Sequence, residues 1–398
     1  MASESGPGAT PGQRAVVSPK GAGRWEAGHP WIYRSDVVER PDLPAGAVAV
    51  TTHRGVALGW ALWSPRSEIA LRLLDRDPGA VINETWWRRR IGEAAARREP
   101  LAAESNAWRV VHGEADGCPS LICDRYDEYL VVQLLSAGVE AFRGDIVAAL
   151  LRQLQPRGIL ARNDVGVRAK EGLTAGVERL HGEVPNEVEV REGTVRYLAA
   201  PWDGQKTGAF LDQRENRRLV GGLAHGNALD CFSYHGSFAL HLAQGASRVT
   251  AVDASAAALA RARVNAGLNG FDNIDTVEAD VFQFLRDRVA AGARYDTIVL
   301  DPPAFAKTKT ALPGALRGYR EINLSGMRLL APGGLLFTAS CSFHLSRELF
   351  VRMLAEAAAD SRRRIAVRAV TGQPVDHPEI LTIPESGYLK GALLQALD

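Results

Sequence analysis

The stretch Asn227–Asp253, NALDCFSYHGSFALHLAQGASRVTAVD, decides the fold. Its pattern predicts a short apolar strand over 227–230, a helix over 237–244 and a second strand over 249–253. The three elements follow one another with few residues between them. Strands and helices that alternate in this way are typical of a doubly wound, mainly parallel sheet. We therefore predict an α/β, Rossmann-like domain around this stretch.

The alternation continues from this stretch to the end of the chain. The alanine-rich run after Ser255 predicts a capped helix that ends near Gly270. Further strands are expected over 274–278, 297–300, 335–338, 365–370 and 389–396. Further helices are expected over 281–291, 316–330 and 346–360.

Two smaller regions precede this domain. Residues 15–74 contain β-like runs at 48–52, 55–63 and 69–74, and we interpret the region as short strands and turns that form a small β-barrel. An arginine-rich helix over 83–99 follows, whose cations either form a solvated face or contact phosphates. The next region is an α+β module, with strands expected at 108–111, 121–124, 129–135 and 158–161, a helix at 139–155, and a hairpin from 187–190 and 194–198.

Composition limits the classes of protein that fit. The chain has 398 residues and a net charge of +1, which indicates two or three domains and no overall basic field. Four cysteines without a C-x-x-C pair indicate a reducing, cytoplasmic setting rather than a disulfide scaffold, and no metal site is expected. We expect no signal peptide and no membrane span, and we interpret residues 1–13 as a disordered tail.

Acidic residues close three successive strands of the predicted sheet. They are Asp230, Asp253 and Asp280, and an acid at the end of the second strand is suited to hydrogen-bond ribose hydroxyls. The loop after the first strand keeps only Gly236 and lacks the glycine-rich fingerprint that admits a pyrophosphate. A cofactor with a ribose and a base but no pyrophosphate fits this loop, and S-adenosylmethionine is such a cofactor. The alternative is that these acids are helix caps or surface residues.

A stiff loop follows the fourth strand of the sheet. It reads Asp301-Pro-Pro-Ala-Phe305, and its two prolines fix the backbone and remove two N–H donors. An acid, free carbonyl groups and an aromatic side chain together suit the binding of a planar base. A rigid turn without a binding role is the alternative.

Cys341 stands where the fifth strand is expected to end, and ligands in such sheets bind beyond the carboxyl ends of the strands. Carbon C5 of cytosine is too weak a nucleophile to take a methyl group unless a thiolate first adds at C6. A free thiol is only about 3% thiolate at pH 7, so the site must activate it. His344 and Lys307 are candidate neighbours. A buried, inert cysteine is the alternative.

Several motifs together resemble a known family. They are Gly28-His-Pro-Trp31, His112-Gly-Glu-Ala-Asp-Gly117 with Asp124-Arg-Tyr126, Gly204-Gln-Lys-Thr-Gly-Ala-Phe-Leu-Asp-Gln-Arg-Glu-Asn-Arg217, Asp230-x-Phe-Ser-Tyr-x-Gly236, Asp301-Pro-Pro-Ala-Phe-Ala-Lys307, Ser340-Cys-Ser342 and Pro384-Glu-Ser-x-Tyr-Leu-Lys390. The chain resembles the bacterial 23S rRNA 5-methylcytosine methyltransferases of the large-subunit methyltransferase I type, over nearly all of its length after residue 13.

The resemblance implies a domain order. A PUA RNA-binding domain would span residues 14–80, a linker helix with a small α+β central domain 81–203, and a class I S-adenosylmethionine-dependent methyltransferase domain 204–398. The partner would be 23S rRNA, and relatives suggest a homodimer.

The resemblance also implies residue roles. Cys341 would be the nucleophile, and Asp301 would hold the cytosine edge or assist proton transfer. The residues expected to line the cofactor site are Gln213, Asp230, Phe232, Ser233, Gly236, Asp253, Asp280 and Asp301. His235 and Ser237 flank Gly236, and Ala209 stands where an aromatic residue is common. The loop after the fourth strand holds no second cysteine, so another group must remove the C5 proton.

Two other functions compete with cytosine C5 methylation. A methyltransferase that acts on guanine N7 or on an exocyclic amine needs no thiol and also uses loops of the D-P-P kind. A non-catalytic RNA-binding assembly protein would use the β-barrel alone. The thiol at Cys341 favours cytosine C5 methylation over both of these functions.

Overall fold

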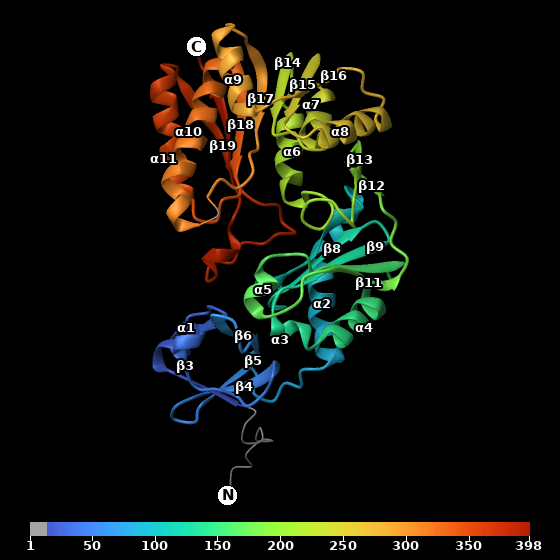
Figure 1. Ribbon diagram of the computed structural model, residues 1–398, viewed down its shortest axis with the longest axis vertical. Helices are drawn as coiled ribbons and strands as arrows, with labels where there is room; N and C mark the ends of the chain where they lie inside the picture. Colours follow the sequence, from blue (N-terminus) through green and yellow to red (C-terminus); the bar gives the residue numbers. More distant parts are fainter. Residues whose placement is uncertain (1–13, 307) are drawn as a thin grey trace, which may run out of the picture. The chain divides into compact units, whose positions relative to one another are not determined.

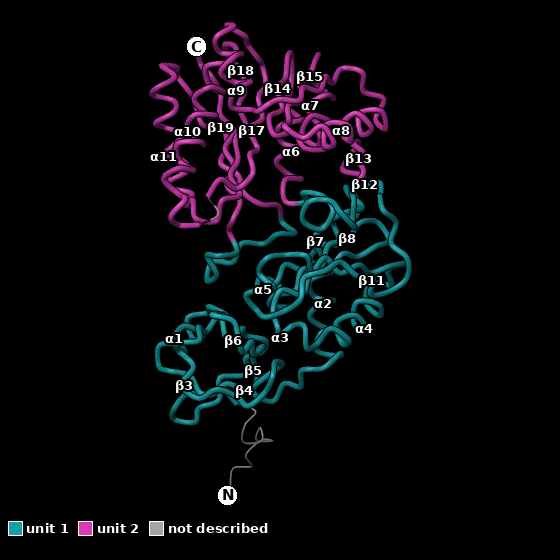
Figure 2. The backbone as a smooth tube through the Cα atoms, in the orientation of Figure 1, with its two compact units in different colours: residues 1–190, 199–211, 375–386 teal, residues 191–198, 212–374, 387–398 magenta. Residues whose placement is uncertain are grey.

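The computed structural model describes residues 14–306 and 308–398, so the predicted tail and Lys307 lie outside the described residues. The chain forms two compact units (Figure 2). The first contains the residues up to 190 together with 199–211 and 375–386, and the second contains 191–198, 212–374 and 387–398. Among the described helices, none is both long enough and apolar enough to cross a membrane.

The second unit is built on a seven-stranded sheet in the order β16-β15-β14-β17-β18-β20-β19 (Figure 1). β20 runs antiparallel to both of its neighbours, and the other pairs are parallel. The strands are β14 (Asn227–Cys231), β15 (Arg248–Asp253), β16 (Ile274–Glu278), β17 (Tyr295–Leu300), β18 (Leu330–Ser340), β19 (Ile365–Thr371) and β20 (Lys390–Ala396). The predicted doubly wound, mainly parallel sheet is confirmed.

Helices cover both faces of this sheet. They are α6 (Arg214–Gly221), α7 (Ser237–Ala243), α8 (Ala256–Leu268), α9 (Val281–Ala290), α10 (Leu312–Leu329) and α11 (Arg347–Ser361). Ile298 and Leu300 of β17 pack in one apolar cluster with α9, α10 and α11, whereas Val299 between them packs in another cluster with α6 and α7. This alternation is what the period of two in a strand requires.

The first unit contains a six-stranded sheet in the order β2-β6-β5-β4-β1-β3. Its elements are β1 (Arg14–Val17), α1 (Pro19–Glu26), β2 (Trp31–Tyr33), β3 (Val37–Glu39), β4 (Gly46–Thr52), β5 (Ala57–Trp63) and β6 (Ile69–Asp75). The prediction of strands and turns alone was wrong over Pro19–Glu26. Ser18 caps that segment by accepting a hydrogen bond from the Gly21 amide, and Pro19 is preset for a first helical turn.

A second, five-stranded sheet lies in the same unit, in the order β11-β10-β9-β8-β7. Its elements are α2 (Glu84–Arg98), β7 (Ala107–His112), β8 (Leu121–Tyr126), β9 (Tyr129–Leu134), α3 (Ala137–Glu140), α4 (Arg143–Leu154), β10 (Gly158–Arg162), α5 (Val167–Glu171) and β11 (Val177–Gly182). The single helix predicted over 139–155 is broken between Glu140 and Arg143. The hairpin of β12 (Val188–Glu192) and β13 (Val195–Ala199) is confirmed.

A buried ion pair joins this hairpin to α6. Arg217 donates from Nε and Nη2 to the two carboxylate oxygens of Glu192, at 2.8 and 2.6 Å, and both side chains are almost fully buried. Burial by itself raises the pKa of Glu192, but the charge and hydrogen bonds of Arg217 outweigh it and hold the pKa below its ordinary value. The carboxylate is therefore ionised and depends on its partner.

We expect Arg217→Met to lower the free energy of unfolding by about 3–5 kcal/mol, because it leaves a buried carboxylate without its cation. Urea unfolding measures the loss. Arg248→Met is the matched control, since Arg248 pairs with Asp275 at an exposed site and its loss should change the free energy of unfolding far less. Equal losses in the two variants would contradict the assignment.

Candidate active site

The predicted site residues gather at one edge of the seven-stranded sheet. Strand order reverses between β14 and β17, because β15 and β16 lie beyond β14 while β18 lies beyond β17. The Asp301 amide donates to the Cys231 carbonyl oxygen across this point at 3.5 Å. Ligands of open α/β sheets bind at such a switch point, outside the carboxyl ends of the strands. Asp230, Asp301 and Cys341 stand at the ends of β14, β17 and β18.

Asp230 is a buried acid with one oxygen left without a partner. The residue is only 1% exposed, and its Oδ2 accepts a hydrogen bond from the Ala239 amide at 2.9 Å. Among the described residues, its Oδ1 has no hydrogen-bond partner. Burial raises the pKa of Asp230 well above its ordinary value; the Ala239 bond opposes this, and the charges of Asp301 and Asp253 add to it. A bound group that donates a hydrogen bond would satisfy this oxygen.

The loop after β14 has an unusual backbone. Phe232 and Tyr234 have φ of 62° and 50°, and Gly236 has φ of 82°. The left-handed region costs non-glycine residues roughly 1–2 kcal/mol each, so the surroundings must hold the loop in place. A Cβ on Gly236 would lie 3.0 Å from the Ala262 Cβ, which leaves little room for a side chain. Strain of this kind, seen at a switch point, points to a binding loop.

The two other predicted acids act locally as well. Asp253 Oδ2 accepts from the Tyr234 amide and its Oδ1 from the Ser255 amide, both at 2.9 Å, so Asp253 fixes the strained loop. Asp280 caps α9 by accepting from the Gln283 amide at 2.9 Å. For Asp280 the structure therefore supports the alternative that the acid is a helix cap. Of the predicted loop residues, Ser233 is buried and donates its amide proton to the Val252 carbonyl oxygen.

Asp301 receives a hydrogen bond from the segment before α6. Gln213 Nε2 donates to Asp301 Oδ1 at 2.8 Å, and Gln213 Oε1 in turn accepts from Asn216 Nδ2 at 2.6 Å. Gln213 was expected near the cofactor, and the structure places it in contact with the acid after β17. Asn216 was not singled out from the sequence. Its signal is the segment itself, which carries polar side chains that are buried.

Cys341 differs from the other three cysteines. It is partly exposed directly after β18, whereas Cys118, Cys123 and Cys231 are fully buried. Burial raises the pKa of each of these three thiols, so they stay protonated. Cys118 and Cys123 are thus buried thiols without the exposure that a reactive cysteine needs. His344, a predicted neighbour, packs edge-on against Phe343, with 5.4 Å between the ring centroids.

Aromatic rings line the Asp301 loop. Phe305 packs against Phe232, Phe282 and Tyr319, with centroid distances of 6.3, 5.8 and 4.6 Å. The contacts of Phe282 and Tyr319 with this loop were not predicted from the sequence, because each residue lies on a helix outside the loop. The arrangement places a stiff acidic loop, an aromatic cluster and a partly exposed cysteine at one sheet edge.

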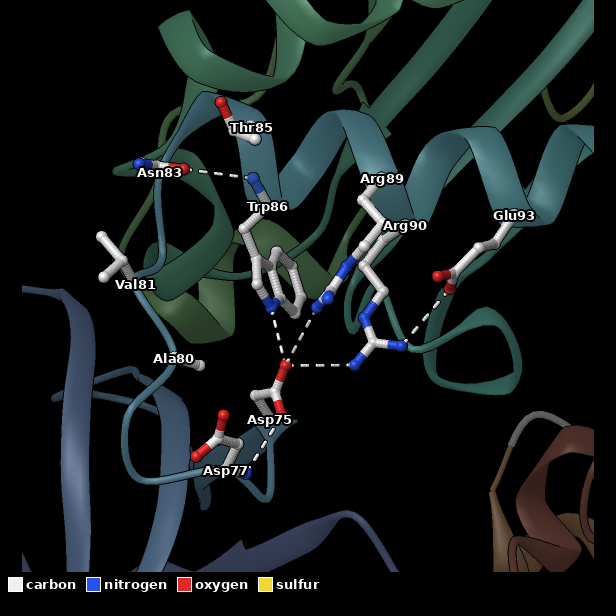
Figure 3. Close-up of a pocket in the computed structure, with 10 residues that line it drawn as sticks. All are labelled: Asp75, Asp77, Ala80, Val81, Asn83, Thr85, Trp86, Arg89, Arg90 and Glu93. Carbon is white, nitrogen blue, oxygen red and sulfur yellow. Dashed lines mark hydrogen bonds and ion pairs between the residues drawn. The ribbon is translucent and has the colours of Figure 1, made fainter.

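A separate pocket of about 590 Å³ lies in the first unit, beside the start of α2 (Figure 3). Its floor is Asp75, whose Oδ2 accepts from Trp86 Nε1 at 2.9 Å, Arg90 at 3.2 Å and Arg89 at 3.4 Å (Figure 3). Arg90 also contacts Glu93. For these two arginines the structure favours the alternative of an ion-paired helix face over phosphate contact, because their charges are already neutralised.

The buried ring of His235 should make the free energy of unfolding depend on pH. Its ring is buried against Tyr197, at 5.2 Å between centroids, and neither ring nitrogen has a partner among the described residues. Burial, helped by the charge of Arg217, lowers the pKa of His235 to about 3. Unfolded histidine titrates near about 6.5, so below that pH the unfolded state binds a proton that the folded state does not.

The free energy of unfolding should therefore fall as the pH drops from about 6.5 toward 4, by up to about 1.4 kcal/mol per pH unit for this group. Urea unfolding of His235→Phe should show a shallower slope than the unchanged protein. His225→Ala is the control, because His225 is exposed. An identical slope in all three proteins would contradict the neutral, buried state of His235.

Comparison with known proteins adds to this geometry. Residues 164–380 match the family described as S-adenosylmethionine-dependent methyltransferase, and residues 15–76 match a PUA-like domain. The chain is 40% identical, over 92% of its length and 95% of the relative's, to ribosomal RNA large subunit methyltransferase I of Shewanella frigidimarina (strain NCIMB 400).

Two solved structures share the fold. One is a SAM-dependent methyltransferase from Streptococcus mutans, with a TM-score of 0.81, 22% identity, and coverage of 96% of this chain and 99% of that one. The other is the methyltransferase SMU.776 complexed with SAH, with a TM-score of 0.83 and the same identity and coverage.

Proposed function

The chain belongs to the ribosomal RNA large subunit methyltransferase I family of S-adenosylmethionine-dependent enzymes, and on this premise we propose that it methylates carbon C5 of a cytosine in 23S rRNA. It is thus an S-adenosylmethionine-dependent methyltransferase of large-subunit ribosomal RNA with a PUA-like domain. The choice of C5 and of a covalent route is the proposal. The three-domain division, the homodimer and the cytoplasmic location stay predictions.

One observation carries the proposal. Of the four cysteines, Cys341 is partly exposed and the other three are buried. Cys341 stands at the carboxyl end of β18, at the same sheet edge as Asp301. Transfer of a methyl group to a nitrogen needs no thiol, because nitrogen lone pairs are nucleophilic without help. Transfer to C5 of cytosine does need one, since this carbon becomes nucleophilic only after addition at C6.

The buried edge at β14 and β15 fits the methyl donor. The free oxygen of Asp230 and the tight loop held by Asp253 offer a hydrogen-bond acceptor and close backbone approach to a ligand. We propose that Gln213, Asp230, Phe232, Ser233, Gly236, Asp253, Asp280 and Asp301 line this site. S-adenosylmethionine supplies an electrophilic methyl group on a sulfonium.

The proposed reaction on the base uses Cys341 twice. The thiol gives its proton to solvent, its sulfur bonds to C6, and the electron pair of the C5–C6 double bond moves to C5. C5 takes the methyl group from the sulfonium of S-adenosylmethionine, whose S–CH3 bond breaks with its electrons staying on the donor sulfur. A base then removes the C5 proton. The pair left behind restores the double bond, and the S–C6 bond breaks with its electrons returning to the sulfur. The loop after β17 has no second cysteine. We therefore propose Asp301 as the group that orients the cytosine ring and assists the removal of its C5 proton.

Bisulfite sequencing of 23S rRNA tests the function, with a deletion strain compared against its parent. The proposal predicts one cytosine that resists conversion in the parent and converts in the deletion strain. Mass analysis of the nucleosides should show 5-methylcytidine lost. Loss of a methylated guanine, or of a base methylated on an exocyclic amine, would instead establish the competing chemistry.

A further inference from the structure

Lys390 is a buried cation at the start of β20. The residue is 4% exposed, and its Nζ donates to the carbonyl oxygen of Ser342 at 2.7 Å and to that of Tyr388 at 2.8 Å. Lysine is depleted in strands and is almost never fully buried without partners. Burying an ammonium group costs free energy unless something offsets the loss of water. The position of Lys390 therefore calls for an explanation.

The strand pairing places Lys390 beside the segment that carries the candidate nucleophile. Lys390 lies opposite Ser340 in the antiparallel pair of β20 and β18. Directly opposed residues of such a pair have Cα atoms roughly 4.5–5.5 Å apart. The ammonium group also binds the carbonyl oxygen of Ser342. Cys341 is the residue between these two points of contact, so Lys390 spans the short segment that carries the thiol.

The same segment is also tied to the Asp301 loop. Ser342 Oγ lies 2.9 Å from Tyr319 OH and accepts from the Ala306 amide at 3.1 Å. The Ser342 amide in turn donates to Ser340 Oγ at 3.2 Å. Ser340, Ser342 and Tyr319 are all fully buried. The thiol-bearing loop is thus held both by a hydroxyl network and by a lysine.

Other titratable groups surround this edge of the sheet. Burial raises the pKa of Tyr319, so its phenol stays neutral, although hydrogen bonds from Ser340 and Ser342 oppose the shift. Other described ionisable groups on the segments that meet at this edge include the acids Asp212, Asp230 and Asp301, the cations Arg214 and Arg347, and the rings of His344 and Tyr388. Asp212 accepts from Tyr388 at 2.8 Å and Asp301 accepts from Gln213. Lys390 is the lysine that contacts the thiol-bearing segment within the described residues.

We propose that Lys390 is a positioning residue for methyl transfer: it fixes the Ser340–Ser342 segment and stabilises the negative sulfur of Cys341 before attack and after release. This inference rests on the proposed function, in which that sulfur is the nucleophile. A cation beside a thiol favours its thiolate. The lysine contacts backbone carbonyl oxygens and so acts through Cys341 rather than on the substrate.

The test is the pH dependence of alkylation of Cys341 by iodoacetamide in the full-length protein. The other three cysteines are fully buried, and Cys341→Ala gives the background. In the unchanged protein, the reaction should reach half its maximal rate below about pH 8.5, the ordinary value for cysteine. In Lys390→Met the profile should move to higher pH, so that at pH 7 the reaction is at least about tenfold slower, with equal rates at high pH.

Lys390→Arg keeps the charge and should recover part of the reactivity at pH 7. Arg368→Met is the matched control, because it removes a cation from the neighbouring strand β19 that contacts Gln395. A half-maximal rate at or above about pH 8.5 in the unchanged protein would overturn the proposal, and this holds even if Lys390→Met fails to fold. Identical profiles for Lys390→Met and the unchanged protein, or for Lys390→Met and Lys390→Arg, would overturn it as well.

Two failures are distinguishable. If the methylated nucleoside is not 5-methylcytidine, the proposed function fails while the alkylation profiles still report whether Lys390 acts on the thiol. If 5-methylcytidine is made but the profiles coincide, the function stands and the role of Lys390 is wrong.

Discussion

Cys341→Ala should abolish methyl transfer to 23S rRNA while leaving the binding of S-adenosylmethionine unchanged. The thiol has no substitute in the proposed reaction, because C5 of cytosine stays unreactive until sulfur adds at C6. Removal of a nucleophile from a covalent enzyme commonly costs several orders of magnitude, and we expect a loss of at least about 10⁴-fold. Transfer of radioactive methyl groups measures the rate, and calorimetry measures cofactor binding.

Two further variants sharpen this result. Cys341→Ser should be equally inactive, because a hydroxyl is a far weaker nucleophile than a thiol at neutral pH. Cys118→Ala removes a fully buried cysteine of the first unit and should keep its activity, apart from a loss of stability. Activity of Cys341→Ala within tenfold of the unchanged protein would exclude the covalent route and favour methylation at a nitrogen.

Asp301→Asn should lower kcat by roughly 10²–10⁴-fold, the range that general acid–base catalysis commonly supplies. The change keeps the shape of the side chain and an oxygen that can accept from Gln213 Nε2, so the loop should stay in place. It removes the negative charge and the capacity to take a proton. The measurement is single-turnover methyl transfer with saturating cofactor and RNA.

Asp275→Asn is the control for this substitution, because Asp275 is an exposed acid on β16 that pairs with Arg248. It should leave the rate unchanged. A normal kcat in Asp301→Asn with a raised KM for RNA would show that the acid only binds the base, and a normal kcat and KM together would remove it from the site.

The alternation of strands and helices was predictable because it depends on local patterns. The helices after Asn83 and Ser255 begin where the sequence predicts, since each cap residue accepts a hydrogen bond from an amide three residues on. The strand ends that carry Asp230, Asp253 and Cys341 followed from short apolar runs bounded by polar residues. Local chemistry thus placed the main site residues at one edge of the sheet.

What the sequence did not predict depends on contacts between distant segments. Lys390 belongs to a quoted motif, but its bond to Ser342 joins residues 48 positions apart. Tyr319 reaches the same segment from a helix, and Asp75 pairs with two arginines of the next element. No periodicity encodes these pairings. The helix Pro19–Glu26 was missed for another reason, because it is short and holds two glycines.

The most direct test of the covalent route is to trap it. RNA with 5-fluorocytidine in place of cytidine, incubated with the protein and S-adenosylmethionine, offers no C5 proton, so the adduct cannot be released after methyl transfer. Mass spectrometry of the digested complex should find the modified cytosine on the peptide that contains Cys341, and no adduct in Cys341→Ala. Methylated RNA without an adduct, or an adduct on another cysteine, would contradict the account.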